Sequence, residues 1–276
     1  MSTGDRSWSA EVVSGLLLLV RTGLALLCLL WPSLLAGQAT DATAQANQQK
    51  ARATLAATLQ ALGGQAWLDL RTSRSRARIA SFFQGTPTGE VAEATMTRQL
   101  PDKERIDFDK GRVVQIFSGN SGWEITYKGK KELPAEQVDA RLRWRKHSLR
   151  TVLGEWYRNP ATVLMDEGQS QVERHLAEKI MLMNAANDAV TLEIDTESHL
   201  PMRLSFAWRD PQFHDKNLDA VEYDNYQKID NIATPFTVTR THNGETVRQT
   251  YLLGVQYNVA LKDGLFDPDR AAAHFK

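Results

Sequence analysis

The sequence predicts an α+β fold in which one strongly curved antiparallel sheet forms an incomplete β-barrel covered by helices. About ten or eleven short segments have the residue pattern of strands and are separated by turn residues. No helix alternates regularly with these strands, as a parallel sheet would require, and two helical segments stand before and within the series. A single sheet with so many strands tends to curl, and its apolar face needs a cover.

Residues 105–127 carry the clearest antiparallel pattern. Ile106 and Phe108 alternate with acidic residues, and Trp123 and Ile125 alternate with polar ones, which is the period of two expected for a strand. The Ser-Gly-Asn-Ser-Gly loop between them tolerates the positive φ angles of a hairpin. We therefore expect three consecutive strands joined by short turns, with one dry face.

Residues 1–39 are predicted to be a signal peptide. An apolar run over residues 12–35 precedes small residues that suit cleavage after Ala39. The same run exceeds the ~20 residues that span a bilayer, so an uncleaved anchor is the alternative. Cleavage is favoured because Arg21 would be costly near a bilayer centre. We expect one periplasmic domain over residues 40–276, or the same domain anchored in the inner membrane and facing the periplasm.

The composition restricts the possible partners. Lys plus Arg and Asp plus Glu each number 33, so the chain has no net field that would attract nucleic acid. The single cysteine, Cys28, lies inside the apolar run, and Leu27 before it is not the small residue of a lipidation signal. We therefore expect no disulfide, no nucleic acid partner and a monomer.

Two helical segments are expected. Residues 42–62 place apolar side chains at helical spacing, and Gly63-Gly64 should end that helix. Residues 132–159 form the second segment, which should dock through a stripe of six apolar side chains: Val138, Leu142, Leu149, Val152, Leu153 and Trp156. Its basic side chains lie largely off this stripe and should face solvent: Arg141, Arg143, Arg145, Lys146 and Arg150. A role for this basic face in binding a partner is the alternative.

The chain carries no recognisable catalytic or metal-binding motif. Its six histidines are not spaced as metal ligands, and no nucleophile elbow, phosphate-binding loop or dinucleotide fingerprint occurs. We predict no catalytic residue, no metal and no cofactor, and hence no enzyme.

Large apolar side chains are expected on the concave face of the curved sheet and on the second helix. Such a surface is either an ordinary core or a cavity for an acyl chain. Seven tryptophans in the chain and an alanine-rich first helix favour the cavity. The predicted ligand-binding residues are Met96, Ile106, Phe108, Trp123, Ile125, Leu149, Leu192, Phe206 and Trp208.

Several short motifs occur in a familiar order. They are Leu62-Gly63-Gly64, Phe82-Phe83-Gln84, Leu100-Pro101, Ile106-Asp107-Phe108, Ser118-Gly119-Asn120-Ser121-Gly122-Trp123, Asp195-Thr196-Glu197-Ser198-His199-Leu200-Pro201-Met202-Arg203, Tyr223-Asp224-Asn225-Tyr226, Ile232-Ala233-Thr234-Pro235 and Leu265-Phe266-Asp267-Pro268. In this order they resemble the LolA-like periplasmic proteins, the outer-membrane lipoprotein-sorting group, over most of the chain after residue 39. The motifs consist of turn and core residues, so they are more specific for the fold than for the task.

The resemblance implies a helix-covered incomplete barrel that shelters the acyl chains of a lipid or lipoprotein. It also implies an inner- or outer-membrane lipoprotein-handling protein as a partner. In the sorting carriers a strand arginine directly before a proline helps to hold the helical lid, whereas Leu100 precedes Pro101 here. The chain is therefore identified as a divergent member, and a structural or sensory envelope protein with a solid core is the alternative.

Overall fold

The computed structural model describes residues 42–275. The chain consists of two compact units, Met1–Gln49 and Lys50–Lys276. In the first unit the described residues, 42–49, are helical and mostly exposed. The predicted signal peptide and Cys28 lie outside the described residues. Within the described part of the chain, no helix is both long and apolar enough to cross a membrane.

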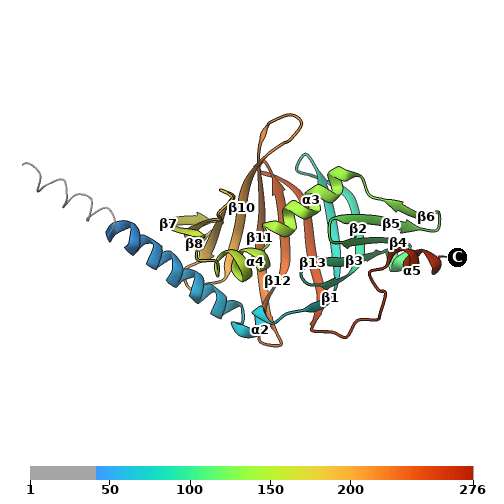
Figure 1. The fold of residues 1–276 in the computed structure, drawn as a ribbon, viewed down its shortest axis with the longest axis horizontal. Helices are drawn as coiled ribbons and strands as arrows, with labels where there is room; N and C mark the ends of the chain where they lie inside the picture. The colour runs from blue at the N-terminus through green and yellow to red at the C-terminus, as the bar shows by residue number, and fades with distance from the viewer. Residues whose placement is uncertain (1–41, 276) are drawn as a thin grey trace, which may run out of the picture. The chain divides into compact units, whose positions relative to one another are not determined.

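The second unit is built on one curved, unclosed antiparallel sheet of 13 strands (Figure 1). The predicted fold class is confirmed, although the strand count exceeds the ten or eleven expected. The two strands that the sequence pattern missed are short or polar, and both lie at the edges of the sheet. The strands are β1 (Thr72–Phe83), β2 (Thr86–Gln99), β3 (Lys103–Phe108), β4 (Val113–Ser118), β5 (Ser121–Thr126), β6 (Gly129–Glu132), β7 (Val163–Val172), β8 (His175–Met183), β9 (Ala189–Asp195), β10 (Pro201–Arg209), β11 (Lys216–Ile229), β12 (Ile232–His242) and β13 (Glu245–Tyr257).

The order of the strands explains where the helices lie. Across the sheet the order is β6-β5-β4-β3-β2-β1-β13-β12-β11-β10-β9-β8-β7, so β6 and β7 form opposite edges although they follow each other in sequence. The segment between them must therefore cross the sheet from one edge to the other. Figure 1 shows this crossing segment, residues 133–162, lying in front of the strands.

The first predicted helix is confirmed over residues 42–62. It ends at Gly63 and Gly64 with two backbone hydrogen bonds, from Gly64 N to Leu59 O at 2.8 Å and from Gly63 N to Gln60 O at 3.0 Å. This pattern satisfies carbonyls that the helix end would otherwise leave unpaired. A side chain at Gly63, which has a φ of +128°, would also place its Cβ 2.8 Å from Asn231 O. Glycine is therefore required where the helix end meets the turn between β11 and β12.

The second predicted helix is not continuous. It is divided into α3 (Ala135–Lys146), α4 (Leu149–Thr151) and the single π-helical turn η2 (Val152–Trp156). The division occurs at Ser148, whose backbone is extended and whose Oγ accepts a hydrogen bond from Thr151 N at 3.3 Å. A serine in this position begins a new helix, so the residues on its two sides follow different axes.

Three clusters of buried apolar side chains stabilise this unit. The largest lies beneath residues 50–62, α2 (Gln65–Leu68), α4 and η2, and against strands β7 to β11. A second, smaller cluster joins β1, β2 and β3. The third packs β4 and β5 against the C-terminal helix α5 (Pro268–Ala273). A short 3₁₀ turn, η1 (Asp109–Gly111), connects β3 with β4.

Candidate functional site

A cavity of about 680 Å³ lies between α3 and the sheet, and we call it the hollow. Its floor is the inner face of β1 to β4 and β11 to β13, and its roof is α3 with α4. Cross-strand pairing aligns the floor, because Met96 lies opposite both Ser75 and Ile106. The apolar part of the floor comprises Ile79, Met96, Ile106, Phe108, Phe117, Val238, Leu252 and Val255.

The inner and outer faces of β1 are chemically distinct. Ser75, Ala77 and Ile79 are buried on the inner side, whereas the alternate residues Arg74 and Arg78 are exposed on the outer side. The basic row of β1 therefore faces solvent. Period-two alternation is what allows one strand to carry both surfaces.

The roof of the hollow is held by arginines as well as by apolar side chains. Of the predicted apolar stripe, Val138 packs against the second cluster, and Leu149, Val152, Leu153 and Trp156 pack in the largest one. Arg141 of α3 forms an ion pair with the buried Glu104 and lies 5.4 Å above the ring centre of Phe117. Arg145 donates hydrogen bonds to the carbonyls of Asp102 at 3.2 Å and of Gly119 at 2.9 Å. The prediction that the basic face of this helix is solvated is wrong for Arg141, Arg143, Arg145 and Arg150, whereas Lys146 is exposed. A planar guanidinium can stack on a ring and donate to several carbonyls, so it can dock a helix.

Two further contacts fix the end of α3 and the start of α4. Arg150 donates to the carbonyls of Trp67 at 2.7 Å and Leu68 at 2.6 Å. His147 is buried, stacks on the Phe206 ring with 3.9 Å between ring centres, and has its Nε2 2.9 Å from a carboxylate oxygen of Asp188. These contacts hold the crossing segment over the hollow.

The lining of the hollow is strongly basic although the chain as a whole has no net charge. Three carboxylates line it, Asp102, Glu104 and Glu155. Eight cationic side chains face them: Arg71, Arg98, Lys103, Arg141, Arg145, Arg150, Arg240 and Arg248. The positive charge is therefore concentrated in the cavity.

The arginines in the hollow affect one another's ionisation. Desolvation, and then the charges of Arg248 and Arg98, lowers the pKa of Arg240 to about 10. Desolvation and four neighbouring arginines, Arg98 first, lower the pKa of Arg141 well below its ordinary value. Desolvation also lowers the pKa of Arg98 and that of Arg248. The hollow therefore holds like charges close together.

Of the nine residues predicted to bind ligand, four line the hollow: Met96, Ile106, Phe108 and Leu149. Leu192 and Phe206 instead lie in the largest cluster with 0% and 2% of their surface exposed, so they fill a core. Trp208 is partly buried, and the guanidinium of Arg143 lies 3.5 Å from its ring centre.

Trp123 and Ile125 are on the other side of the sheet from the hollow. They lie opposite Ile116 and Val114 of β4, and all four belong to the cluster beneath α5. The intervening residue of β4, Gln115, lines the hollow. The expectation that Trp123 and Ile125 face the hollow is therefore wrong. The neighbouring strand β4 carries apolar side chains on both faces, so strand periodicity does not indicate which face a given helix covers.

The sequence interpretation missed the arginines of the floor. Arg98 follows Met96 by two positions and Arg240 follows Val238 by two, so strand periodicity places each on the same face as an apolar lining residue. That spacing was the available signal. An arginine in phase with an inward apolar series indicates a charged patch in the cavity.

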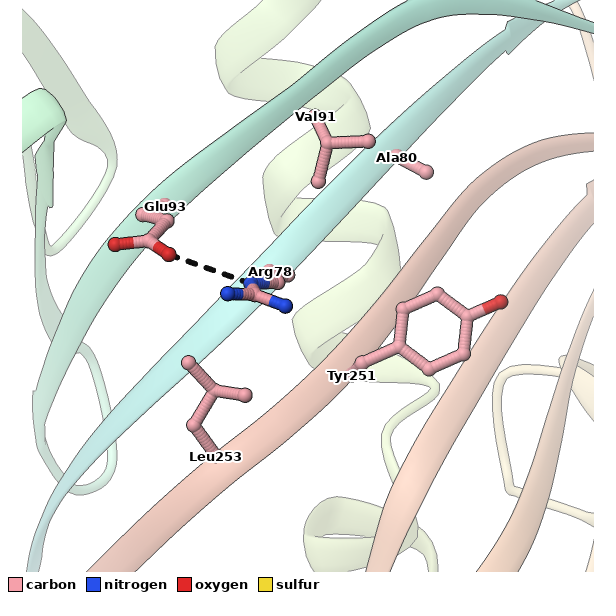
Figure 2. Close-up of a pocket in the computed structure, with 6 residues that line it drawn as sticks. All are labelled: Arg78, Ala80, Val91, Glu93, Tyr251 and Leu253. Atoms are coloured by element: carbon pink, nitrogen blue, oxygen red, sulfur yellow. Dashed lines mark hydrogen bonds and ion pairs between the residues drawn. The ribbon is translucent and has the colours of Figure 1, made fainter.

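The outer face has a shallower depression between β1, β2 and β13. Figure 2 shows Ala80, Val91, Tyr251 and Leu253 around it, with Arg78 Nε 3.3 Å from a carboxylate oxygen of Glu93. Val91 is 59% exposed. This depression is an open surface, unlike the roofed hollow on the inner face.

Histidine and carboxylate side chains meet in pairs in the described residues. Asp219 Oδ1 is 2.7 Å from His242 Nδ1, and Asp188 Oδ1 is 2.9 Å from His147 Nε2. Within residues 42–275 no group of three or more His, Cys, Asp or Glu side chains is arranged to hold a metal ion.

Comparison with known proteins relates the fold to solved structures. No protein-family model matches the chain, and no curated protein matches it. A DUF1329 family protein from Desulfovibrio piger has a TM-score of 0.55 at 12% identity, over 82% of this chain and 99% of that one. A domain assigned to the outer membrane lipoprotein-sorting proteins, from Vibrio parahaemolyticus, has a TM-score of 0.52 at 11% identity, over 82% of this chain and 100% of that one. These similarities concern the fold.

Proposed function

We propose that this chain, whose fold is LolA-like, binds the acyl chain of a lipid or lipoprotein in the hollow and shields it from water in the cell envelope. The observation that carries the proposal is the roofed cavity with its apolar floor. Its volume of about 680 Å³ lies within the ~300 to 1,000 Å³ range of ligand pockets in proteins. The role is one of binding, without catalysis.

The floor suits a chain better than a compact ligand. Apolar lining residues come from β1 to β4 and β11 to β13, so they follow the inner face across seven adjacent strands. Burial of methylene groups against such a surface stabilises a complex by about 0.8 kcal/mol for each group. A chain laid along the floor would therefore gain affinity with length.

The proposed location is the periplasm, and it rests on the predicted signal peptide of residues 1–39. A membrane protein that handles lipoproteins is the proposed partner. Identifying the mature amino terminus of the exported protein tests this location. A mature protein that begins near residue 40 supports it, whereas a protein retained in the cytoplasm overturns it.

A second candidate is a structural or sensory envelope protein without a lipid ligand. The packed cluster against β7 to β11 favours it, because Leu192 and Phe206 fill that part of the inner face. The two candidates differ in whether anything occupies the hollow.

Binding of a neutral amphiphile, monopalmitoylglycerol, decides between them. We expect the purified protein to bind it and the Thr250→Trp variant to lose about tenfold in affinity or more, because Thr250 lines the hollow and an indole would fill it. Thr95→Trp is the matched control, since Thr95 lies on the outer face of β2, between the inward-facing Ala94 and Met96.

Mass spectrometry of the protein under native conditions provides an independent measurement. Lipid that copurifies with the wild type and is depleted in the Thr250→Trp variant supports the proposal. Absence of bound lipid together with no binding of monopalmitoylglycerol would favour the structural protein with a solid core.

A further inference from the structure

The hollow contains two cationic side chains on neighbouring strands without a partner for their charge. Arg240 and Arg248 lie directly opposite each other on β12 and β13. Like charges at directly opposed positions of an antiparallel pair destabilise the sheet. Among residues 42–275 neither guanidinium forms an ion pair or a side-chain hydrogen bond. The fold therefore retains an arrangement that is unfavourable by itself.

The other groups that face this pair do not neutralise it. Arg240 lies over the ring of Trp144, with 4.4 Å between the guanidinium carbon and the ring centre, which orients the cation but does not cancel its charge. Glu104 is a buried carboxylate of the hollow, but it is already shared by Arg98, at 2.6 Å, and Arg141. One carboxylate thus serves two arginines. The charge of Asp219 also acts on Arg240, but this carboxylate is already paired with Arg143 and His242.

We propose that the arginines of the hollow, centred on Arg240 and Arg248, bind the anionic head group of an amphiphile whose acyl chain lies on the apolar floor. The inference rests on the proposed function and adds the chemical class of the ligand, an acyl chain that carries a phosphate or carboxylate. Guanidinium groups donate paired hydrogen bonds to both anions.

Head group and chain can be held together because the basic and apolar residues share one surface. Val238 precedes Arg240 by two positions on β12, and Thr250 and Leu252 follow Arg248 at the same spacing on β13. All five side chains line the hollow. An anion between the two arginines would therefore have its chain directed along adjoining apolar side chains. Its charge would also relieve the repulsion from Arg248 and Arg98, which adds to desolvation in lowering the pKa of Arg240.

The test compares three probes: monopalmitoylglycerol, palmitoyl lysophosphatidic acid, which has the same chain and a phosphate monoester, and inorganic phosphate. We expect the wild type to bind the anionic lipid at least about tenfold more tightly than the neutral one. We expect the ratio of the two affinities, that for the anionic lipid over that for the neutral lipid, to fall towards one in Arg248→Gln and in Arg240→Gln. Arg248 has no protein partner to lose, so its substitution should not prevent folding. Arg76→Gln, on the outer face of β1, should keep the ratio of the wild type.

The possible outcomes separate the two proposals. Equal affinity of the wild type for both lipids would overturn the head-group inference and leave the proposed function standing. Failure of both lipids to bind would overturn the proposed function and the inference with it. Inorganic phosphate that binds as tightly as the anionic lipid would overturn the inference, because the chain would then contribute nothing. A ratio that stays unchanged in both arginine variants would also overturn it.

Discussion

Two halves of the same inner face differ in what covers them. Against β7 to β11 the cover consists of residues 50–62, α4 and η2, whose buried side chains are mostly apolar, as in Leu55 and Leu153, and the space is filled. Over β1 to β3, β12 and β13 the cover is α3, which reaches the sheet through Arg141 and Arg145, and a cavity remains. The side chains that meet between sheet and helices therefore decide the outcome: apolar ones from both layers make a core, whereas arginines from both layers leave a hollow.

The sharpest test of this comparison truncates one leucine in each half. Leu192→Ala in the filled half should lower the free energy of unfolding by about 3 to 5 kcal/mol, because Leu192 is 0% exposed and its loss leaves a closed void. Leu252→Ala should cost less than half as much, since Leu252 is partly buried and already borders a cavity. Urea denaturation measures both. Equal losses would show that the two halves are packed alike.

A second test concerns the arginine contacts of α3. Arg143→Gln removes the cation 3.5 Å from the ring centre of Trp208 and 3.7 Å from a carboxylate oxygen of Asp219. We expect a loss of about 1 to 2 kcal/mol in the free energy of unfolding, because the side chain is largely shielded from water. A double-mutant cycle with Trp208→Leu should give a coupling of at least about 0.5 kcal/mol.

The exposed Arg76 on β1 provides the control for this measurement, and Arg76→Gln should change stability by less than about 0.5 kcal/mol. If Arg143→Gln behaves like Arg76→Gln, arginines do not hold α3 to the sheet, and the proposed difference between the two halves is wrong.

The smallest expected effect is a pH dependence at the end of α3. Burial by itself would raise the pKa of Asp188, but hydrogen bonds from Lys146 and His147 outweigh it, and the pKa is lowered. A carboxyl whose pKa is lowered by folding contributes stability that is present above its unfolded value of about 3.9 and is lost as the pH falls through the folded value. The Tm of the wild type should therefore fall by more between about pH 5 and pH 3 than the Tm of the Asp188→Asn variant. Equal losses would show that Asp188 does not contribute.

More of the fold than of the site could be predicted from the sequence. Alternation such as Ala77 and Ile79 against Arg78 is a local signal, and it indicated the strands and the curved sheet correctly. The residue pattern did not predict the strand β7, because polar residues and a bulge near Gly168 interrupt its alternation. The division of the second helix at Ser148 was not predicted either, because an apolar stripe can continue across it.

The site depended on information that periodicity does not contain. Trp123 and Met96 have similar strand patterns, yet they face opposite sides, because α5 covers the outer face of β5 as an apolar partner. The arginines of α3 were expected in water because charge usually indicates exposure. Which charged groups become docking contacts is determined by residues distant in sequence, such as Glu104 for Arg141.

The pairing of β1 with β13 has a consequence for how the chain acquires its structure. Ser73 lies opposite Tyr257, so the middle of the sheet joins the first strand of residues 42–275 with the last one. Contacts between such distant segments carry a large entropic cost of loop closure and form slowly. Until the final strand arrives, β1 has a free edge that is open to aggregation. The edge of β1 must therefore be protected until β13 has paired with it.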